Sequence, residues 1–157
     1  MGLFLLNILL AIAWVALTGS FTGVNFVLGA VLAYALLLMF RDQFQDPRYF
    51  NKVWQLIYFI VYFIWQLTLA NLRVSWEVLT PGWRMEPGIV GIPLDLETEL
   101  EITILANLIT LTPGTLSLDV SSDGRTLYVH SMYVHDVDEF RASIKNGFEK
   151  RVRELMA

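Results

Sequence analysis

Residues Val53 to Leu72 read V-W-Q-L-I-Y-F-I-V-Y-F-I-W-Q-L-T-L-A-N-L, twenty residues without a charged side chain. A helix rises about 1.5 Å per residue, so this stretch matches a bilayer core of about 30 Å. We expect the helix to continue until Thr80-Pro81-Gly82, because proline and glycine together end a helix. The sequence therefore predicts a transmembrane helix over residues 53–79, with Trp54 near one interface and Arg73 at the other.

The composition is that of an integral membrane protein with a small water-soluble part. The chain has 157 residues, of which 55% are apolar and 17% are charged. The apolar residues concentrate in residues 3–40 and 53–72, and the rest has the balance of a globular domain. A net charge of −4 without a basic patch gives no reason to expect nucleic acid, and the absence of cysteine excludes disulfides and thiolate metal sites.

Two uncharged runs, residues 3–18 and 24–40, precede the central stretch and predict an antiparallel pair of membrane helices. No lysine or arginine comes before the first run, so we expect a retained span rather than a cleaved signal peptide. Gly29 and Ala33 form a small-residue stripe with Asn25, which suits close helix packing, either within this pair or against another subunit. We expect Asn7 to donate a hydrogen bond between helices.

Residues 88–157 predict a separate soluble domain, and the whole chain a membrane α+β fold with transmembrane helices in residues 1–80. Thr98 and Glu101 form a capping box, Thr112-Pro113-Gly114 ends the helix that it opens, and Asp123-Gly124 suits a hairpin turn. The pattern is a ferredoxin-like βαββα order that lacks the last strand. The expected elements are a strand over 89–95, a helix over 99–111, strands over 115–120 and 127–134, and a helix over 137–155.

Catalytic and ion-binding chemistry is poorly represented in this chain. His130 and His135 point to opposite faces of an extended strand, so a shared metal is not expected. The runs 3–40 and 53–72 contain no Asp, Glu, Lys, Arg or His, which argues against an ion path built by this chain alone. We therefore predict neither an enzyme nor a cofactor. Aromatic residues of the central helix are expected to face lipid or to pack against other subunits, among them Trp54, Tyr58, Tyr62 and Trp65.

The charges give two conflicting signals for orientation. The loop from Arg41 to Lys52 has a mild positive excess, which would place it in the cytoplasm. The soluble half has a basic cluster in its last helix, residues 141–153, and a single crossing by residues 53–79 would place it opposite that loop. The residues alone leave the orientation open.

The stretch Leu108 to Leu116, L-I-T-L-T-P-G-T-L, followed by Asp119-Val120, Asp123-Gly124 and Leu127 to His130, resembles the E subunit of the Mrp family of multisubunit sodium/proton antiporters. The resemblance covers essentially the whole chain. It implies a hetero-oligomeric complex in which large antiporter-like subunits handle sodium and protons. It also implies a multi-pass protein of the bacterial cell membrane whose soluble domain lies in the cytoplasm.

These observations predict an accessory subunit that supports assembly and cation/proton exchange. The motif residues Thr112, Pro113, Gly114 and Thr115 are interpreted as a structural corner that aims the following hairpin. The alternative is a free-standing, membrane-anchored module that senses a ligand through its soluble domain.

Overall fold

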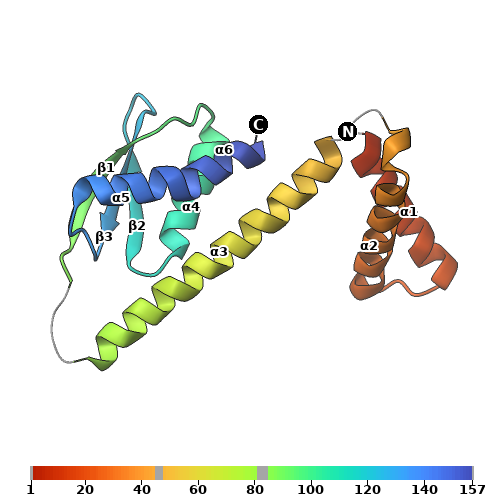
Figure 1. Ribbon diagram of the computed structural model, residues 1–157, viewed down its shortest axis with the longest axis horizontal. Helices are drawn as coiled ribbons and strands as arrows, with labels where there is room; N and C mark the ends of the chain where they lie inside the picture. The colour runs from red at the N-terminus through yellow and green to blue at the C-terminus, as the bar shows by residue number, and fades with distance from the viewer. Residues whose placement is uncertain (1, 45–47, 81–84, 157) are drawn as a thin grey trace. The chain divides into compact units, whose positions relative to one another are not determined.

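The computed structural model describes residues 2–44, 48–80 and 85–156 of the chain (Figure 1). The chain divides into two compact units, Met1–Trp54 and Gln55–Ala157. The first unit is helical, and the second combines most of a long helix with a small mixed domain.

The amino-terminal unit is built around a helical hairpin of α1 (Gly2–Thr18) and α2 (Gly23–Met39). Asn7 is 4% exposed and donates to the carbonyl oxygen of Ala30 at 3.4 Å, as predicted for a link between the helices. Asn25 lies at the turn, where its amide accepts from Trp14 Nε1 at 3.0 Å and donates to Thr18 Oγ1 at 2.6 Å. The side-chain amides of Asn7 and Asn25 thus link the two helices.

The long helix α3 (Arg48–Leu79) confirms the helix predicted from the central apolar stretch and ends directly before Thr80. The proposed stop residues Pro81 and Gly82 lie outside the described residues. Within the part of the chain that the structure describes, residues Tyr49–Leu79 form the one helix that is long and apolar enough to cross a membrane. The helices α1 and α2 are apolar but shorter, at 17 residues each.

The mixed domain contains a three-stranded antiparallel sheet in the order β1-β3-β2. Its strands are β1 (Gly88–Pro93), β2 (Thr115–Val120) and β3 (Thr126–Ser131). Strand β3 ends earlier than the predicted 127–134, because the chain leaves the ladder after Ser131 and Tyr133 forms a separate bridge with Glu86. The register between β2 and β3 shifts between Ser117 and Asp119.

Helix α4 (Glu99–Leu111) covers one face of the sheet and begins with the predicted capping box. The Thr98 hydroxyl accepts from the backbone of Glu101, whose carboxylate accepts from the backbone of Thr98 at 2.9 Å. Apolar side chains form most of the core between helices and sheet. Those with 0% or 1% exposure are Ile92, Leu105, Ile109, Leu127, Val129 and Val152.

The last helix is less regular than its apolar pattern predicted. It consists of α5 (Val137–Ile144), a π-helical segment (Lys145–Glu149) and α6 (Lys150–Met156). The core residues Ile144, Phe148 and Val152 follow one another at steps of four, and a regular α-helix would turn each out of line by about 40°. All three are buried, at 6%, 7% and 0% exposure, and the helix widens in the π-helical segment that holds Phe148.

Side chains from the last helix occupy the outer edge of β1. Arg141 Nε donates to the carbonyl oxygen of Gly91 at 2.9 Å, and Lys145 Nζ donates to that of Pro93 at 2.7 Å. Buried Glu149 accepts from the backbone N–H of Asp95 at 2.5 Å just beyond the strand. These contacts satisfy edge groups that a further strand would otherwise bind.

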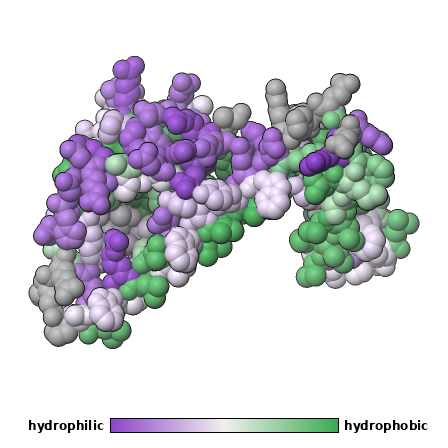
Figure 2. Space-filling view, viewed as in Figure 1, coloured by the Kyte–Doolittle hydropathy of each residue, from purple (hydrophilic) through white to green (hydrophobic). Residues whose placement is uncertain are grey.

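The face of the sheet opposite the helices is open and partly apolar. Tyr128 and Met132 are 42% and 37% exposed on this side. Ile89, Leu116 and Leu118 extend the same face. Hydrophilic residues otherwise dominate the view of the mixed domain in Figure 2, whereas hydrophobic residues dominate the hairpin and one side of α3.

Candidate functional site

The candidate functional site is the contact between α3 and the mixed domain, because it joins the apolar part of the chain to the polar part. At its centre is Phe148, which is 7% exposed and lies in the π-helical segment. Its ring meets Tyr62 edge-on at 5.8 Å between centroids and Phe63 at 6.4 Å. Together with Phe59, these two side chains attach the middle of α3 to the domain core.

Arg151 forms a second layer of this contact. Its guanidinium carbon lies 3.5 Å from the centroid of the Tyr62 ring and 5.5 Å from that of Tyr58. It also donates to the Tyr58 hydroxyl at 3.3 Å and to the carbonyl oxygens of Asn146 and Gly147 at 3.0 and 2.8 Å. The cation is therefore held between aromatic rings of α3 and the backbone of the π-helical segment.

Gly147 allows this close approach. A Cβ atom at this position would lie 2.9 Å from the Tyr62 hydroxyl oxygen, closer than real Cβ contacts. The same hydroxyl accepts from Gln66 Nε2 at 2.8 Å, so it cannot move away without losing that bond. The glycine is a steric requirement of the docking between α3 and the domain.

Further along α3, a second attachment point lies around Tyr133. Arg73 stacks on this ring at 5.5 Å, and the Glu77 carboxylate hydrogen-bonds to its hydroxyl. Burial, followed by the hydrogen bond and the charge of Glu77, raises the pKa of Tyr133 above its ordinary value, while the charge of Arg73 acts in the opposite direction. The phenol therefore remains a neutral hydrogen-bond donor near neutral pH.

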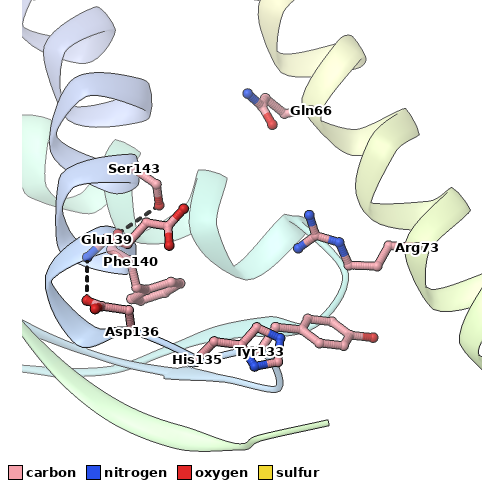
Figure 3. A pocket seen from close by; sticks show the side chains of 8 residues that line it. All are labelled: Gln66, Arg73, Tyr133, His135, Asp136, Glu139, Phe140 and Ser143. Carbon is pink, nitrogen blue, oxygen red and sulfur yellow. Dashed lines mark hydrogen bonds between the residues drawn. The ribbon is translucent and has the colours of Figure 1, made fainter. Parts of the chain in front are cut away.

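A hollow of about 550 Å³ lies beside this attachment point (Figure 3). In Figure 3, Arg73 extends from α3 toward Tyr133, while the amino end of α5 faces them. Asp136 is already used as the cap of α5, accepting from the backbone of Asp138 and Glu139 at 2.7 and 2.9 Å. The lining residues are Gln66, Arg73, Tyr133, His135, Asp136, Glu139, Phe140 and Ser143.

The charged groups of this hollow do not form a reactive or metal-binding arrangement. His135 Nδ1 lies 2.9 Å from Glu86 Oε2, and both side chains are exposed. Among the residues described, no three His, Cys, Asp or Glu side chains come together as metal ligands would. What the arrangement can do is bind polar groups or water between α3 and α5.

The motif corner Thr112–Thr115 lies against the same attachment point. Thr115 Oγ1 donates to the carbonyl oxygens of Ile109 and Thr112 at 2.6 and 2.9 Å, and this closes the corner after α4. Gly114 has a φ of 90°, and a Cβ atom there would lie 3.0 Å from the Tyr133 ring. Thr112 and Pro113 line a small cavity of about 200 Å³ with Arg73 of α3.

The residues proposed for subunit packing fall into three groups. Gly29 and Ala33 are buried within the hairpin, where a Cβ on Gly29 would lie 2.9 Å from Trp14 Cδ1. Tyr58 and Tyr62 contact Arg151 of the same chain. Trp54 and Trp65 are 63% and 60% exposed.

Sequence reasoning did not single out Phe148, Arg151 or Gly147 as site residues, although it placed Phe148 on the apolar face of the last helix. The apolar positions of the last helix follow at steps of 3, 4, 4, 4 and 3, which suit a regular α-helix, so the spacing gave no signal for the π-helical segment. The partners of these three residues on α3 are distant in the sequence, so local patterns could not pair them.

Comparison with known proteins gives consistent matches along nearly the whole chain. The model of a family described as Na+/H+ ion antiporter subunit matches residues 7–155. The E subunit of the Na+/H+ antiporter of Alkalihalophilus pseudofirmus is 37% identical over 151 residues, with 96% of both chains covered. The corresponding E subunit of Bacillus subtilis is 38% identical at the same coverage.

One solved structure is similar over the same length. A chain of the membrane-bound sulfane sulfur reductase, an archaeal respiratory membrane complex, is 33% identical, covers 98% of both chains and has a TM-score of 0.59. The similarity therefore includes both the helical part and the mixed domain.

Proposed function

This chain belongs to the Na+/H+ ion antiporter subunit family, and from that premise we propose that it serves as the E subunit, a structural component, of a multisubunit sodium/proton antiporter in the bacterial cell membrane. Its partners are the other membrane subunits of that complex. Its role is to support assembly and cation/proton exchange by subunits that carry the ion path. No catalytic step is assigned to it.

The observation that carries this proposal is how the chain uses its polar groups. Residues 3–40 and 53–72 contain no ionisable side chain of the Asp, Glu, Lys, Arg or His type. The amides of Asn7 and Asn25 bind partners within the hairpin, and Thr68 and Asn71 of α3 donate to carbonyl oxygens one turn earlier at 2.7 and 2.9 Å. These groups support packing and leave proton transfer to other subunits.

We further propose a topology in which α1 and α2 cross the bilayer and the mixed domain lies in the cytoplasm. The element order from β1 to the last helix supports a ferredoxin-like βαββα domain without its fourth strand. Arg141 and Lys145 support the absence of that strand, because they bind the carbonyl groups at the edge of β1 to which it would otherwise bind. The motif corner is proposed to hold Tyr133 against α3.

The test is affinity purification of the chromosomally tagged chain in mild detergent. We expect large antiporter-like membrane subunits to co-purify in a fixed ratio. Gly29→Ala should reduce their recovery, because its Cβ would meet Trp14 and the carbonyl of Ala11, whereas Gly23→Ala has open space and serves as the control. A chain that purifies alone and folded would contradict the structural role.

A sensing module is the second candidate function, and the polar hollow next to Arg73 is the observation that favours it. Such a module should purify without partners and gain thermal stability with a small polar ligand. The co-purification experiment separates the two functions, since only a structural component of a complex needs its partners to be stable.

A further inference from the structure

The contacts of α3 bear on how this helix meets the membrane. Its length and composition suit a crossing, but the mixed domain attaches to one side of it at Tyr58, Tyr62 and Arg73. Tyr58 and Arg73 are fifteen residues apart, or about 22 Å along the helix. The domain therefore accompanies α3 over most of the length that a crossing would place in the hydrocarbon core.

Polar groups of the domain occur at the middle of this contact. Arg151 stacks on Tyr62, which lies at the centre of the uncharged stretch, and the adjacent Lys150 is 56% exposed on its side chain. If α3 crossed the bilayer with these contacts intact, Arg151 would enter the hydrocarbon core together with Lys150 and its half-exposed partner Glu154, which lies 4.0 Å away. Charged groups at that depth are strongly disfavoured unless they face water or a paired group.

The two sides of α3 differ in a way that suits the membrane surface. Between residues 53 and 79 the charged residues are Arg73 and Glu77, and both contact Tyr133 on the domain side. Trp65 and Trp76, which are 60% and 67% exposed, lie on the flank of this contact, and the opposite side carries the exposed apolar residues Ile57, Val61, Ile64 and Leu72. Tryptophan favours the boundary between headgroups and acyl chains.

We propose that α3 lies in the plane of the membrane at the cytoplasmic interface, with the exposed apolar side of Ile57, Val61, Ile64 and Leu72 in the lipid and the mixed domain attached to its other side. This is the arrangement of an interfacial amphipathic helix, which buries one apolar face at the boundary of headgroups and acyl chains. It replaces the single crossing expected from length alone. The occupant of the exposed apolar side is the lipid bilayer.

This placement also removes the conflict between the charge signals. With α1 and α2 as the crossing helices, the loop from Arg41 to Lys52 and the mixed domain share one side of the bilayer. Both carry basic residues, so the positive-inside rule places them together in the cytoplasm. A crossing by α3 would put one of the two outside.

The inference rests on the part of the proposed function that attaches the chain to the membrane. It does not depend on ion exchange.

The test measures immersion depth along the lipid-facing side of α3 in the purified assembly in lipid vesicles. Because the chain has no cysteine, single cysteines can carry nitroxide labels at Ile57, Val61, Ile64, Thr68, Leu72 and Ser75, which share one side of the helix. Relaxation by oxygen and by a water-soluble nickel chelate reports depth. Labels on the exposed side of α1 serve as the control, because this helix is proposed to cross the bilayer. Their positions are Leu5, Leu9, Ile12 and Ala16.

An in-plane helix gives one shallow depth at all six positions of α3, whereas depth changes steadily along α1. A profile that is deepest near Ile64 and shallow at both ends, over the roughly 27 Å from Ile57 to Ser75, would overturn the proposal. Low access to both reagents would also overturn it, because protein rather than lipid would then cover this side.

An independent measurement uses Asn51→Cys and Ser122→Cys with a membrane-impermeant maleimide in cells, and Ser20→Cys in the hairpin turn as the control. In-plane placement predicts that the first two react only after the cytoplasmic side is opened, while Ser20→Cys reacts in intact cells. Reaction of Asn51→Cys and Ser122→Cys from opposite sides would contradict it. If the antiporter assignment is wrong, the other subunits will not co-purify, but the immersion depths and the maleimide labelling will still be those of an in-plane helix.

Discussion

The guanidinium group of Arg151 stacks on the ring of Tyr62 at 3.5 Å, which joins the last helix of the chain to the middle of its longest apolar helix. The local sequence around either residue does not predict this contact, since Arg151 belongs to a charged helix face and Tyr62 to an aromatic stretch. The contact makes the carboxyl-terminal segment responsible for the position of α3 on the domain. It is the contact whose removal should affect membrane attachment and assembly most directly.

Arg151→Ala should weaken the docking of α3 more than Arg153→Ala, which changes an exposed arginine on the same helix. Loss of the stacking contact and of the bond to Tyr58 should lower stability by about 0.5–2 kcal/mol. Arg151→Lys should restore only part of it, because an ammonium group cannot stack and donate in the same fork geometry. Thermal unfolding of the purified assembly measures the difference, and equal effects of both alanine variants would contradict the assigned role.

Gly147→Ala should destabilise the protein although alanine is the better helix former. The added methyl group would meet the Tyr62 hydroxyl at 2.9 Å, and overpacking typically costs about 1–3 kcal/mol. Combining it with Tyr62→Phe removes the clashing oxygen, so the pair should be less destabilising than the sum of the single variants. A double-mutant cycle on unfolding free energies tests this. If Gly147→Ala raises stability, helix propensity alone governs the position.

Gly114→Ala should lower stability more than Gly124→Ala. Both glycines have positive φ, 90° and 71°, so each substitution strains the backbone by about 1–3 kcal/mol. Only Gly114 has a neighbour, the Tyr133 ring at 3.0 Å, whereas nothing lies within 4 Å of a Cβ on Gly124. Unfolding measurements on the two variants separate the contact from the strain.

The double variant Pro113→Gly, Gly114→Val extends this test to function. It should reduce the amount of assembled complex and sodium tolerance, because the corner would no longer support Tyr133 against α3. Wild-type levels of both would rule out a structural role of the corner.

Acid should destabilise the mixed domain through its helix caps. Backbone hydrogen bonds from Glu139 and Asp138 lower the pKa of Asp136 below 3.8, and bonds from the backbone and side chain of Thr98 lower the pKa of Glu101 below 4.5. A lower pKa in the folded state means that the unfolded chain binds protons first as the pH falls. This stabilisation is complete above about pH 4.5 and disappears as the pH falls through the folded-state values.

Asp136→Asn keeps a good cap without a titrating group, so its stability should depend less on pH in this range. Unfolding midpoints between about pH 3 and pH 7 measure the dependence. Identical slopes for the variant and the parent chain would show that this cap does not contribute to it.

The amino-acid sequence by itself determined the features that arise from neighbouring residues. The three long apolar helices, the capping box of Thr98 and Glu101, and the helix end at Thr112 follow from periodicity and backbone preferences that act within a few residues. The same local patterns carried the family resemblance.

Only the tertiary structure decided how these elements meet. Which side of α3 faces the domain depends on Phe148 and Arg151, and the closed edge of β1 depends on Arg141 and Lys145. The π-helical segment Lys145–Glu149 interrupts a helix whose spacing predicted a regular one, and it lies where Phe148 meets α3. These features come from contacts between distant parts of the chain, whose energies no local pattern contains, and they distinguish a helix that crosses a membrane from one that lies along it.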